Sequence, residues 1–450
     1  MFKKFCFAAA FFALFPLWAK DPVEIRDIFY YDDINLIEHN AKYAYERCRL
    51  DLFIPGNDET KRPVVLFFHG GGLRGGKKYF PEELKKSGAI VVSANYRLSG
   101  DSAKCPDYLY DAAAAANWVF KHISEYGGDP DCVVISGHSA GGYLAAMVGM
   151  DARYLAKFGE KNTRFLMIAP VSGQMTTHFQ IQNERLGTQQ EIAEHVVVDE
   201  YAPIWHAKKG LPPVILFTGG VDLDWPSRPQ ENQLLYSVLR KIHQDTRAEI
   251  YSIDGFGHSE CIDPALTILV KRKLWSAYAE KKRAVNMPEK YLLNSGKKIV
   301  FQAQRTGKAK VGASAVIAQK NGKIIVDVTC AEPAFDRLVY GARAWSSDCL
   351  NLYLATADDK EGQYVMDSNG RTEFYSFGLA KRPFVAEVKK TSGGWQAHYE
   401  VDVDGADGKL VKANLVRDRH TKDAREITCW SPVYGNGFQE KESLVPLVEK

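Results

Sequence analysis

The sequence predicts two domains: an α/β domain with a doubly wound, mainly parallel sheet, followed by an all-β sandwich domain. Three observations support this. Strand-like apolar runs alternate with amphipathic helical stretches over residues 23–285. Short segments of alternating apolar and polar residues, separated by Gly, Asn and Asp turns, fill residues 295–450. The chain of 450 residues also exceeds the usual size of one hydrophobic core. We therefore expect the domain boundary between Lys281 and Ser295.

The first 19 residues have the pattern of a secretory signal peptide. Lys3 and Lys4 precede an apolar run over residues 5–15, and a cleavage site follows at Ala19. Leu17 is larger than such a site prefers, so uncleaved anchoring is the alternative. Because the apolar run is short for a membrane span, we expect a secreted or periplasmic protein with no span after cleavage.

The composition is that of an ordinary soluble globular protein. Hydrophobic residues make up 46% of the chain, charged residues 25%, and the formal net charge is +3, which gives no basic character suited to nucleic acid. Of the 8 cysteines, Cys6 lies in the signal segment, so an odd number remains and at least one thiol stays unpaired. No Cys/His cluster has metal-ligand spacing, and we expect no metal and no other cofactor.

The elements of the first domain follow from apolar runs and turn signals. The predicted strands are residues 46–54, 63–69, 89–96, 132–137, 164–171, 213–219 and 248–254. The predicted helices are residues 80–88, 110–128, 141–150, 229–245 and 264–282. Strands that alternate with helices in this way favour βα units around a parallel sheet.

The second domain shows only short strand patterns. Residues 298–304, 323–330, 349–356, 384–390 and 395–403 alternate between apolar and polar side chains. This periodicity of two, with turn residues between the segments, predicts a sandwich of antiparallel sheets.

A serine between two glycines joins the predicted strand over residues 132–137 to the predicted helix over 141–150. In this GxSxG pattern Ser139 stands on a sharp turn that exposes its hydroxyl, and Gly137 and Gly141 remove side chains that would collide with the adjoining elements. The helix directs its free N–H groups at the serine. We therefore expect Ser139 to be a nucleophile. The alternative is an ordinary glycine-rich turn.

A glycine run follows the strand over residues 63–69. His69 precedes three glycines, and we expect the N–H groups of Gly71 and Gly72 to join that of Ala140 as an oxyanion hole. A phosphate-binding loop is the alternative, but Lys78 stands where that motif needs Ser or Thr.

Two aspartates follow the strand over residues 213–219, and the sequence leaves the choice between them open. We favour Asp222 over Asp224 as the acid because it is nearer to the strand end. His258 follows the last strand in a glycine-flanked loop and is the expected base, whereas His195 and His206 follow no strand of the sheet.

The predicted triad has the chain order Ser, Asp, His, with each residue at or just beyond the end of a separate strand. In this arrangement His258 takes the proton of Ser139 as the serine attacks an ester carbonyl, and Asp222 fixes the imidazole tautomer. Water then hydrolyses the acyl-enzyme by the same proton route.

These residues resemble the α/β-hydrolase superfamily, and specifically its HGGG esterase/lipase branch, which is similar to bacterial carbohydrate esterases of the feruloyl and acetyl-xylan kind. The resemblance covers about residues 45–280 and includes HGGG at 69–72, SANYRLSG at 93–100 and YGGDPDCVVISGHSAGG at 126–142. It implies the same roles for the predicted triad and oxyanion donors. The spacing of Gly219, Asp222 and Pro226 also resembles the acid loop of this family, which favours Asp222.

Residues 295–450 are similar to family 9 carbohydrate-binding modules, through pieces such as ARAWSSDCLNLYLAT and GGWQAHYEVDV. The resemblance implies sugar binding, with Trp345 as the candidate platform because apolar sugar faces pack on indole rings. A core position for Trp345 is the alternative, and we expect Trp395 and Trp430 in the core.

Together these features predict an exported serine esterase that removes acetyl or feruloyl groups from an acylated poly- or oligosaccharide. Two alternatives stay open. GHSAGGY also resembles the elbow of prolyl-oligopeptidase-type serine peptidases, although the HGGG loop argues against a peptidase. A catalytically inactive sugar-binding protein is the other, although the complete triad argues against it.

Overall fold

In a computed structural model the chain divides into two compact units, Met1–Leu266 and Thr267–Lys450. The structure describes residues 21–56, 61–100, 102–186, 196–286, 290–303, 311–422, 425–431 and 443–449. The predicted signal peptide, residues 1–19, and His195 lie outside the described residues.

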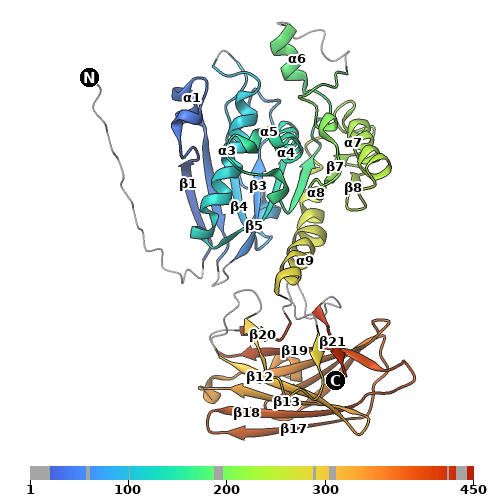
Figure 1. Cartoon of the computed structure of the whole chain (residues 1–450). Helices are drawn as coiled ribbons and strands as arrows, with labels where there is room; N and C mark the ends of the chain where they lie inside the picture. The colour runs from blue at the N-terminus through green and yellow to red at the C-terminus, as the bar shows by residue number, and fades with distance from the viewer. Residues whose placement is uncertain are drawn as a thin grey trace. The chain divides into compact units, whose positions relative to one another are not determined.

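The first unit is built on one eight-stranded sheet with the order β1-β2-β4-β3-β5-β6-β7-β8 (Figure 1). Strands β1 and β2 pair antiparallel, as do β2 and β4, while β4-β3-β5-β6-β7-β8 pair in parallel. The strands are β1 Val23–Phe29, β2 Arg49–Ile54, β3 Arg62–Phe68, β4 Ile90–Ala94, β5 Gly128–His138, β6 Met167–Val171, β7 Ile215–Gly219 and β8 Glu249–Ile253. The predicted mainly parallel sheet is confirmed, and β1 is an addition to it.

Helices connect these strands. They are α1 Ala41–Arg47, α2 Glu82–Lys85, α3 Asp107–His122, α4 Ala140–Met150, α5 Ala152–Ala156, α6 Phe179–Leu186, α7 Arg228–Ser237 and α8 Ile262–Ile268. Helices α3, α4 and α5 lie together beside the sheet, and α7 packs on β7 and β8 (Figure 1). Strands β3 and β4 are buried along their whole length, which explains their continuous apolar sequences.

The second unit is a sandwich of two sheets whose strands pair antiparallel, except for the parallel pair of β21 and β9. One has the order β10-β12-β13-β18-β17 and the other β11-β20-β19-β14-β15-β16, with β21 paired to β19 and β9. The strands are β9 Tyr291–Leu292, β10 Ile299–Val300, β11 Gln302–Ala303, β12 Ala313–Lys320, β13 Lys323–Ala331, β14 Cys349–Thr356, β15 Glu361–Asp367, β16 Thr372–Phe377, β17 Phe384–Thr391, β18 Gly394–Asp402, β19 Leu410–His420, β20 Arg425–Cys429 and β21 Val445–Val448. Trp395 and Trp430 belong to its buried core, as predicted.

The division between the units falls inside a helical run. Helix α8 continues through Leu269–Leu274 into α9, Trp275–Asn286, and the first unit ends at Leu266 within this run. The boundary expected from the sequence, between Lys281 and Ser295, lies further along the chain and stays a prediction. In the part of the chain that the structure describes, no helix has both the length and the hydrophobicity to cross a membrane.

The 7 cysteines of the described residues form no disulfide. Six of them are buried, and Cys105 is half-buried.

Candidate active site

Ser139 stands on the turn between β5 and α4. Its backbone has φ 55° and ψ −117°, a conformation that is costly for any residue other than glycine. The turn is held by hydrogen bonds from Ser139 N to the Val171 carbonyl (2.9 Å) and from Tyr143 N to the Ser139 carbonyl (2.9 Å).

The two flanking glycines permit this turn. A Cβ atom on Gly141 would lie 2.0 Å from the Phe68 carbonyl oxygen, and one on Gly137 would lie 2.5 Å from the Gly141 carbonyl. Any side chain at either position would therefore separate β3, β5 and α4, which is the physical reason for the GxSxG pattern.

His258 reaches Ser139 from the loop between β8 and α8. Its Nε2 lies 2.8 Å from Ser139 Oγ. Two hydrogen bonds to the backbone hold this loop in place: the His258 carbonyl lies 2.7 Å from His138 Nε2 and 3.3 Å from the Cys261 thiol. Burial lowers the pKa of His138 to about 4, so this imidazole is neutral at pH 7 and its Nε2–H donates to the carbonyl.

Asp224 is the carboxylate that contacts His258, and the prediction of Asp222 is wrong. Asp224 Oδ1 lies 2.6 Å from His258 Nδ1, whereas Asp222 is exposed. After β7 the chain makes one tight turn, in which Leu223 N and Asp224 N both donate to the Gly220 carbonyl. This turn leaves Asp222 exposed and brings Asp224 back to the end of β7. Asp222 is nearer to that strand in the sequence, but Asp224 is the residue that reaches His258.

Four groups donate hydrogen bonds to the Asp224 carboxylate. They are His258 Nδ1 at 2.6 Å, Ser172 Oγ at 2.7 Å, Gly219 N at 2.7 Å and Trp225 N at 2.7 Å. Burial alone would raise the pKa of Asp224, but these hydrogen bonds outweigh it and hold the pKa at about 2. The carboxylate is therefore ionised at neutral pH and acts only as an acceptor.

The HGGG loop lies against the serine. A Cβ atom on Gly70 would be 3.3 Å from Ser139 Cβ. Gly71 has φ 114° and Gly72 φ 59°, which are both in the region that favours glycine. Ala140 begins α4, so its N–H is one of the helix donors without an intrahelical partner. The fold thus brings Gly70 of this loop and the first residue of α4 to the side of Ser139, while the oxyanion function of Gly71, Gly72 and Ala140 stays a prediction.

His69 supports this loop from inside the protein. Its ring stacks on Tyr96 with centroids 4.5 Å apart, and its Nδ1 lies 2.7 Å from the Gly70 carbonyl. Burial lowers the pKa of His69 to about 4, so the ring is neutral and takes no charged part in the site.

Trp225 and Arg228 lie in the segment that follows Asp224. Trp225 is 53% exposed and its ring centroid lies 5.8 Å from that of His258. Arg228 is buried, its Nη2 donates to Gln174 Oε1 at 3.2 Å, and its Nε has no partner among the residues that the structure describes. An exposed loop tryptophan has no distinguishing sequence pattern, so only the fold could show its place beside the base.

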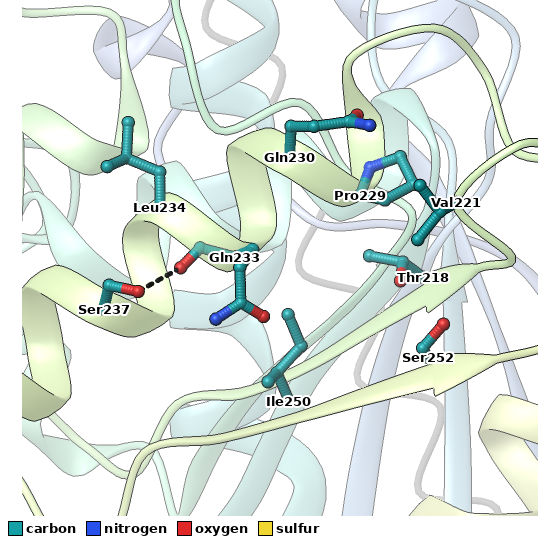
Figure 2. A pocket seen from close by; sticks show the side chains of 9 residues that line it. All are labelled: Thr218, Val221, Pro229, Gln230, Gln233, Leu234, Ser237, Ile250 and Ser252. Atoms are coloured by element: carbon teal, nitrogen blue, oxygen red, sulfur yellow. Dashed lines mark hydrogen bonds between the residues drawn. The ribbon is translucent and has the colours of Figure 1, made fainter.

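A cavity of about 580 Å³ lies on the flank of α7, over β7 and β8. Figure 2 shows Thr218 and Ile250 of the strands below it and Gln233 and Leu234 of the helix above it. Ser139, Asp224 and His258 are not among its lining residues, so this cavity is separate from the triad.

Trp345 lies in the second unit, on a short helical turn over Ala344–Ser346, and is 50% exposed. Trp395 is fully buried and Trp430 is 7% exposed. The core alternative for Trp345 is therefore excluded, and the indole face is available to solvent.

Residues 50–236 match the BD-FAE family model. This match covers about two fifths of the chain. The mainly parallel sheet with its connecting helices has the α/β-hydrolase fold. The hydrolase unit carries all the residues of the candidate active site.

Curated relatives of the hydrolase unit are esterases by name. The chain is 35% identical over 169 residues to "Probable carboxylic ester hydrolase LipM" of Mycobacterium tuberculosis, covering 34% of this chain and 38% of that protein. It is 34% identical over 152 residues to "Esterase cest-33" of Caenorhabditis elegans, covering 30% and 26%. The chain thus spans less than two fifths of the length of either relative.

Among solved structures, the chain is similar to "Truncated form of carbohydrate esterase from gut microbiota". The sequence identity is 17%, the TM-score is 0.45, and the match covers 56% of this chain and 95% of that one.

Proposed function

We propose that this protein is a serine carboxylic ester hydrolase with Ser139 as nucleophile, His258 as general base and Asp224 as acid. One observation carries the proposal: an unbroken hydrogen-bonded chain runs from Ser139 Oγ to His258 Nε2 (2.8 Å) and from His258 Nδ1 to Asp224 Oδ1 (2.6 Å). The family match and the esterase names of the relatives support it.

The contacts define the direction of proton transfer. Because the Asp224 carboxylate is ionised, it accepts the Nδ1 proton of His258 and leaves Nε2 as the free base. Nε2 removes the Ser139 proton as Oγ attacks the ester carbonyl, and the imidazolium that forms is stabilised by Asp224. The imidazolium then protonates the departing alcohol, which leaves an acyl group on Ser139.

The oxyanion of the tetrahedral intermediate needs donors that are already in place. The N–H groups of Ala140, Gly71 and Gly72 fit this role, because one begins α4 and the others belong to the loop against Ser139. A water molecule then replaces the alcohol and releases the acid by the same proton route.

The substrate that we propose is an acylated poly- or oligosaccharide, outside the cytoplasm, with acetyl or feruloyl as the acyl group. Trp225 offers an exposed indole beside His258, and Trp345 offers another on the sandwich unit. Aromatic faces of this kind pack on the apolar faces of sugars and on phenolic acyl groups.

Hydrolysis of p-nitrophenyl acetate tests the chemistry. We expect the wild type to turn over this ester and to react with a fluorophosphonate probe at Ser139, and Ser139→Ala to lose about 10³-fold or more of kcat with unchanged circular dichroism. Undiminished turnover by Ser139→Ala would overturn the assignment of the nucleophile.

Release of acid from natural polymers tests the substrate. Acetylated xylan and feruloylated xylan are compared with an acetylated pectin and with an aminoacyl-prolyl peptide, using Ser139→Ala as the blank. Acid release from a xylan supports the proposal. Cleavage of the peptide alone would indicate a peptidase, and activity on p-nitrophenyl acetate alone would indicate an esterase of small molecules.

A further inference from the structure

Ser172 lies at the centre of the candidate active site, although no sequence motif marks it. It directly follows β6, between the strand that leads to Ser139 and the strand that leads to Asp224. Its N–H donates to the Phe217 carbonyl of β7 at 2.7 Å, and the Val171 carbonyl just before it accepts from Ser139 N. The residue is fully buried.

The Ser172 hydroxyl contacts both of the groups that assist Ser139. Its Oγ lies 2.7 Å from each oxygen of the Asp224 carboxylate and 2.9 Å from His258 Nδ1. A hydroxyl has one proton to donate and two lone pairs. Since an ionised carboxylate can only accept, the proton goes to Asp224, and a lone pair faces the Nδ1–H of His258.

The backbone of Ser172 is strained in order to make these contacts. Its φ is 47°, in the left-handed region that residues other than glycine rarely adopt. Such strain persists where the surrounding structure requires it, and it is concentrated at functional sites. Here the strained residue is the one whose hydroxyl joins acid and base.

The geometry excludes a direct role for Ser172 in proton removal from Ser139. It faces Nδ1 of the imidazole, whereas Ser139 faces Nε2. Any effect of the Ser172 hydroxyl on the reaction therefore passes through Asp224 and His258.

We propose that Ser172 is a positioning residue, whose hydroxyl locks the Asp224 carboxylate and the His258 imidazole into the arrangement that points Nε2 at Ser139. This inference rests on the proposed function. It adds a fourth side chain to the hydrogen-bonded chain and makes the carboxyl end of β6 part of the catalytic apparatus.

The test compares Ser172→Ala with a matched control, Ser136→Ala. Ser136 is also fully buried in the sheet, and its hydroxyl donates to the Ala169 carbonyl at 2.7 Å without contact to the triad. We expect Ser172→Ala to lower kcat for p-nitrophenyl acetate about 10-fold with KM changed less than about twofold, and Ser136→Ala to leave both nearly unchanged.

A double-mutant cycle separates positioning from a general structural effect. If Ser172 acts through the carboxylate, its removal lowers kcat about 10-fold in the wild type but less than about twofold in the Asp224→Ala background. Equal effects in the two backgrounds, or full activity of Ser172→Ala, would overturn the inference. If Ser172→Ala does not fold, Ser172→Gly replaces it in the cycle, because glycine adopts a φ of 47° without strain.

The proposed function is judged separately within the same experiment. Activity in the wild type and in Ser136→Ala, and its loss in Ser139→Ala, support the function whatever Ser172→Ala does. Activity that survives Ser139→Ala would overturn the function and this inference with it.

Discussion

At the scale of single residues, the number of hydrogen bonds that a carboxylate accepts decides its protonation state and its function. Asp224 accepts from two side chains and two backbone N–H groups, and its pKa of about 2 follows from them despite burial. Asp222, two residues earlier, is exposed. Two chemically identical side chains in one loop therefore have different environments.

Replacing each aspartate by asparagine tests this difference. We expect Asp224→Asn to lower kcat about 10³- to 10⁴-fold, because an amide can donate to Nδ1 and so stabilise the wrong imidazole tautomer. Asp222→Asn is the matched control and should change kcat less than about twofold. Both are measured with p-nitrophenyl acetate at pH 7. The opposite ranking would restore Asp222 as the acid.

The pKa of Asp224 also predicts a pH dependence of stability. The carboxyl has an ordinary pKa of 3.8 in the unfolded chain and about 2 in the folded chain. Its contribution is therefore fully present above about pH 4 and is lost as the pH falls through 2, a change of about 2 kcal/mol. We expect urea unfolding from pH 5 to pH 2 to show this loss in the wild type and not in Asp224→Asn. Parallel pH dependences for the two proteins would contradict it.

The sequence indicated some site residues much better than others. Ser139 and His258 were predictable because a glycine-bracketed serine and a glycine-flanked histidine each follow a strand of recognisable pattern. Ser172 was not, since a serine after a strand is common and its strained φ is visible only in the structure. The contact between His138 and the base loop could not be predicted either, because its partner is the backbone carbonyl of His258, 120 residues away in the sequence.

At the scale of elements, the serine turn depends on how closely two strands and a helix approach. Strand β3 runs beside β5, and α4 packs against both. The closest point of this packing is Gly141 against the Phe68 carbonyl. The turn is therefore determined as much by β3 as by its own residues.

Gly141→Ala tests that dependence. The added Cβ would lie 2.0 Å from a backbone oxygen, so α4 or β3 must shift. We expect a loss of about 1 to 3 kcal/mol of stability, the range typical of an overpacked core, and a large loss of kcat. The matched control is Gly100→Ala, where an added Cβ meets nothing within 4 Å. Equal melting temperatures for the two variants would show that the contact relaxes easily.

Buried elements were easier to predict than exposed ones. The seven predicted strands of the first unit are all present, and the most apolar of them, such as β3 and β4, are buried along their whole length. Strand β1 was missed because it is an edge strand whose sequence, VEIRDIF, has charges among its apolar residues. The segments named from the sequence of the second unit do not include β9, β12, β15, β16, β19, β20 and β21, because paired strands gain much of their stability from neighbours that the local sequence does not show.

At the scale of the whole molecule, the chain combines the candidate active site of the first unit with an exposed tryptophan on the second. Trp345 projects from a turn next to β14, while the other two tryptophans named in this unit are in its core. A sugar-binding role for the sandwich therefore depends on this one indole among the three.

Affinity gels that contain xylan test that role with the full chain. We expect Trp345→Ala to weaken retardation about 10-fold, as loss of an aromatic anchor does, without changing kcat on p-nitrophenyl acetate. Trp205→Ala is the matched control, since Trp205 is 62% exposed in the first unit. Unchanged retardation of Trp345→Ala would remove the sugar platform from the proposal.

The burial of the described cysteines has a consequence for their reactivity. Burial raises the pKa of thiols such as Cys105, Cys261 and Cys330, so little thiolate forms at neutral pH and exchange with external thiols is slow. Thiol reagents added to the folded protein should therefore label these cysteines slowly, and unfolding should make the labelling fast.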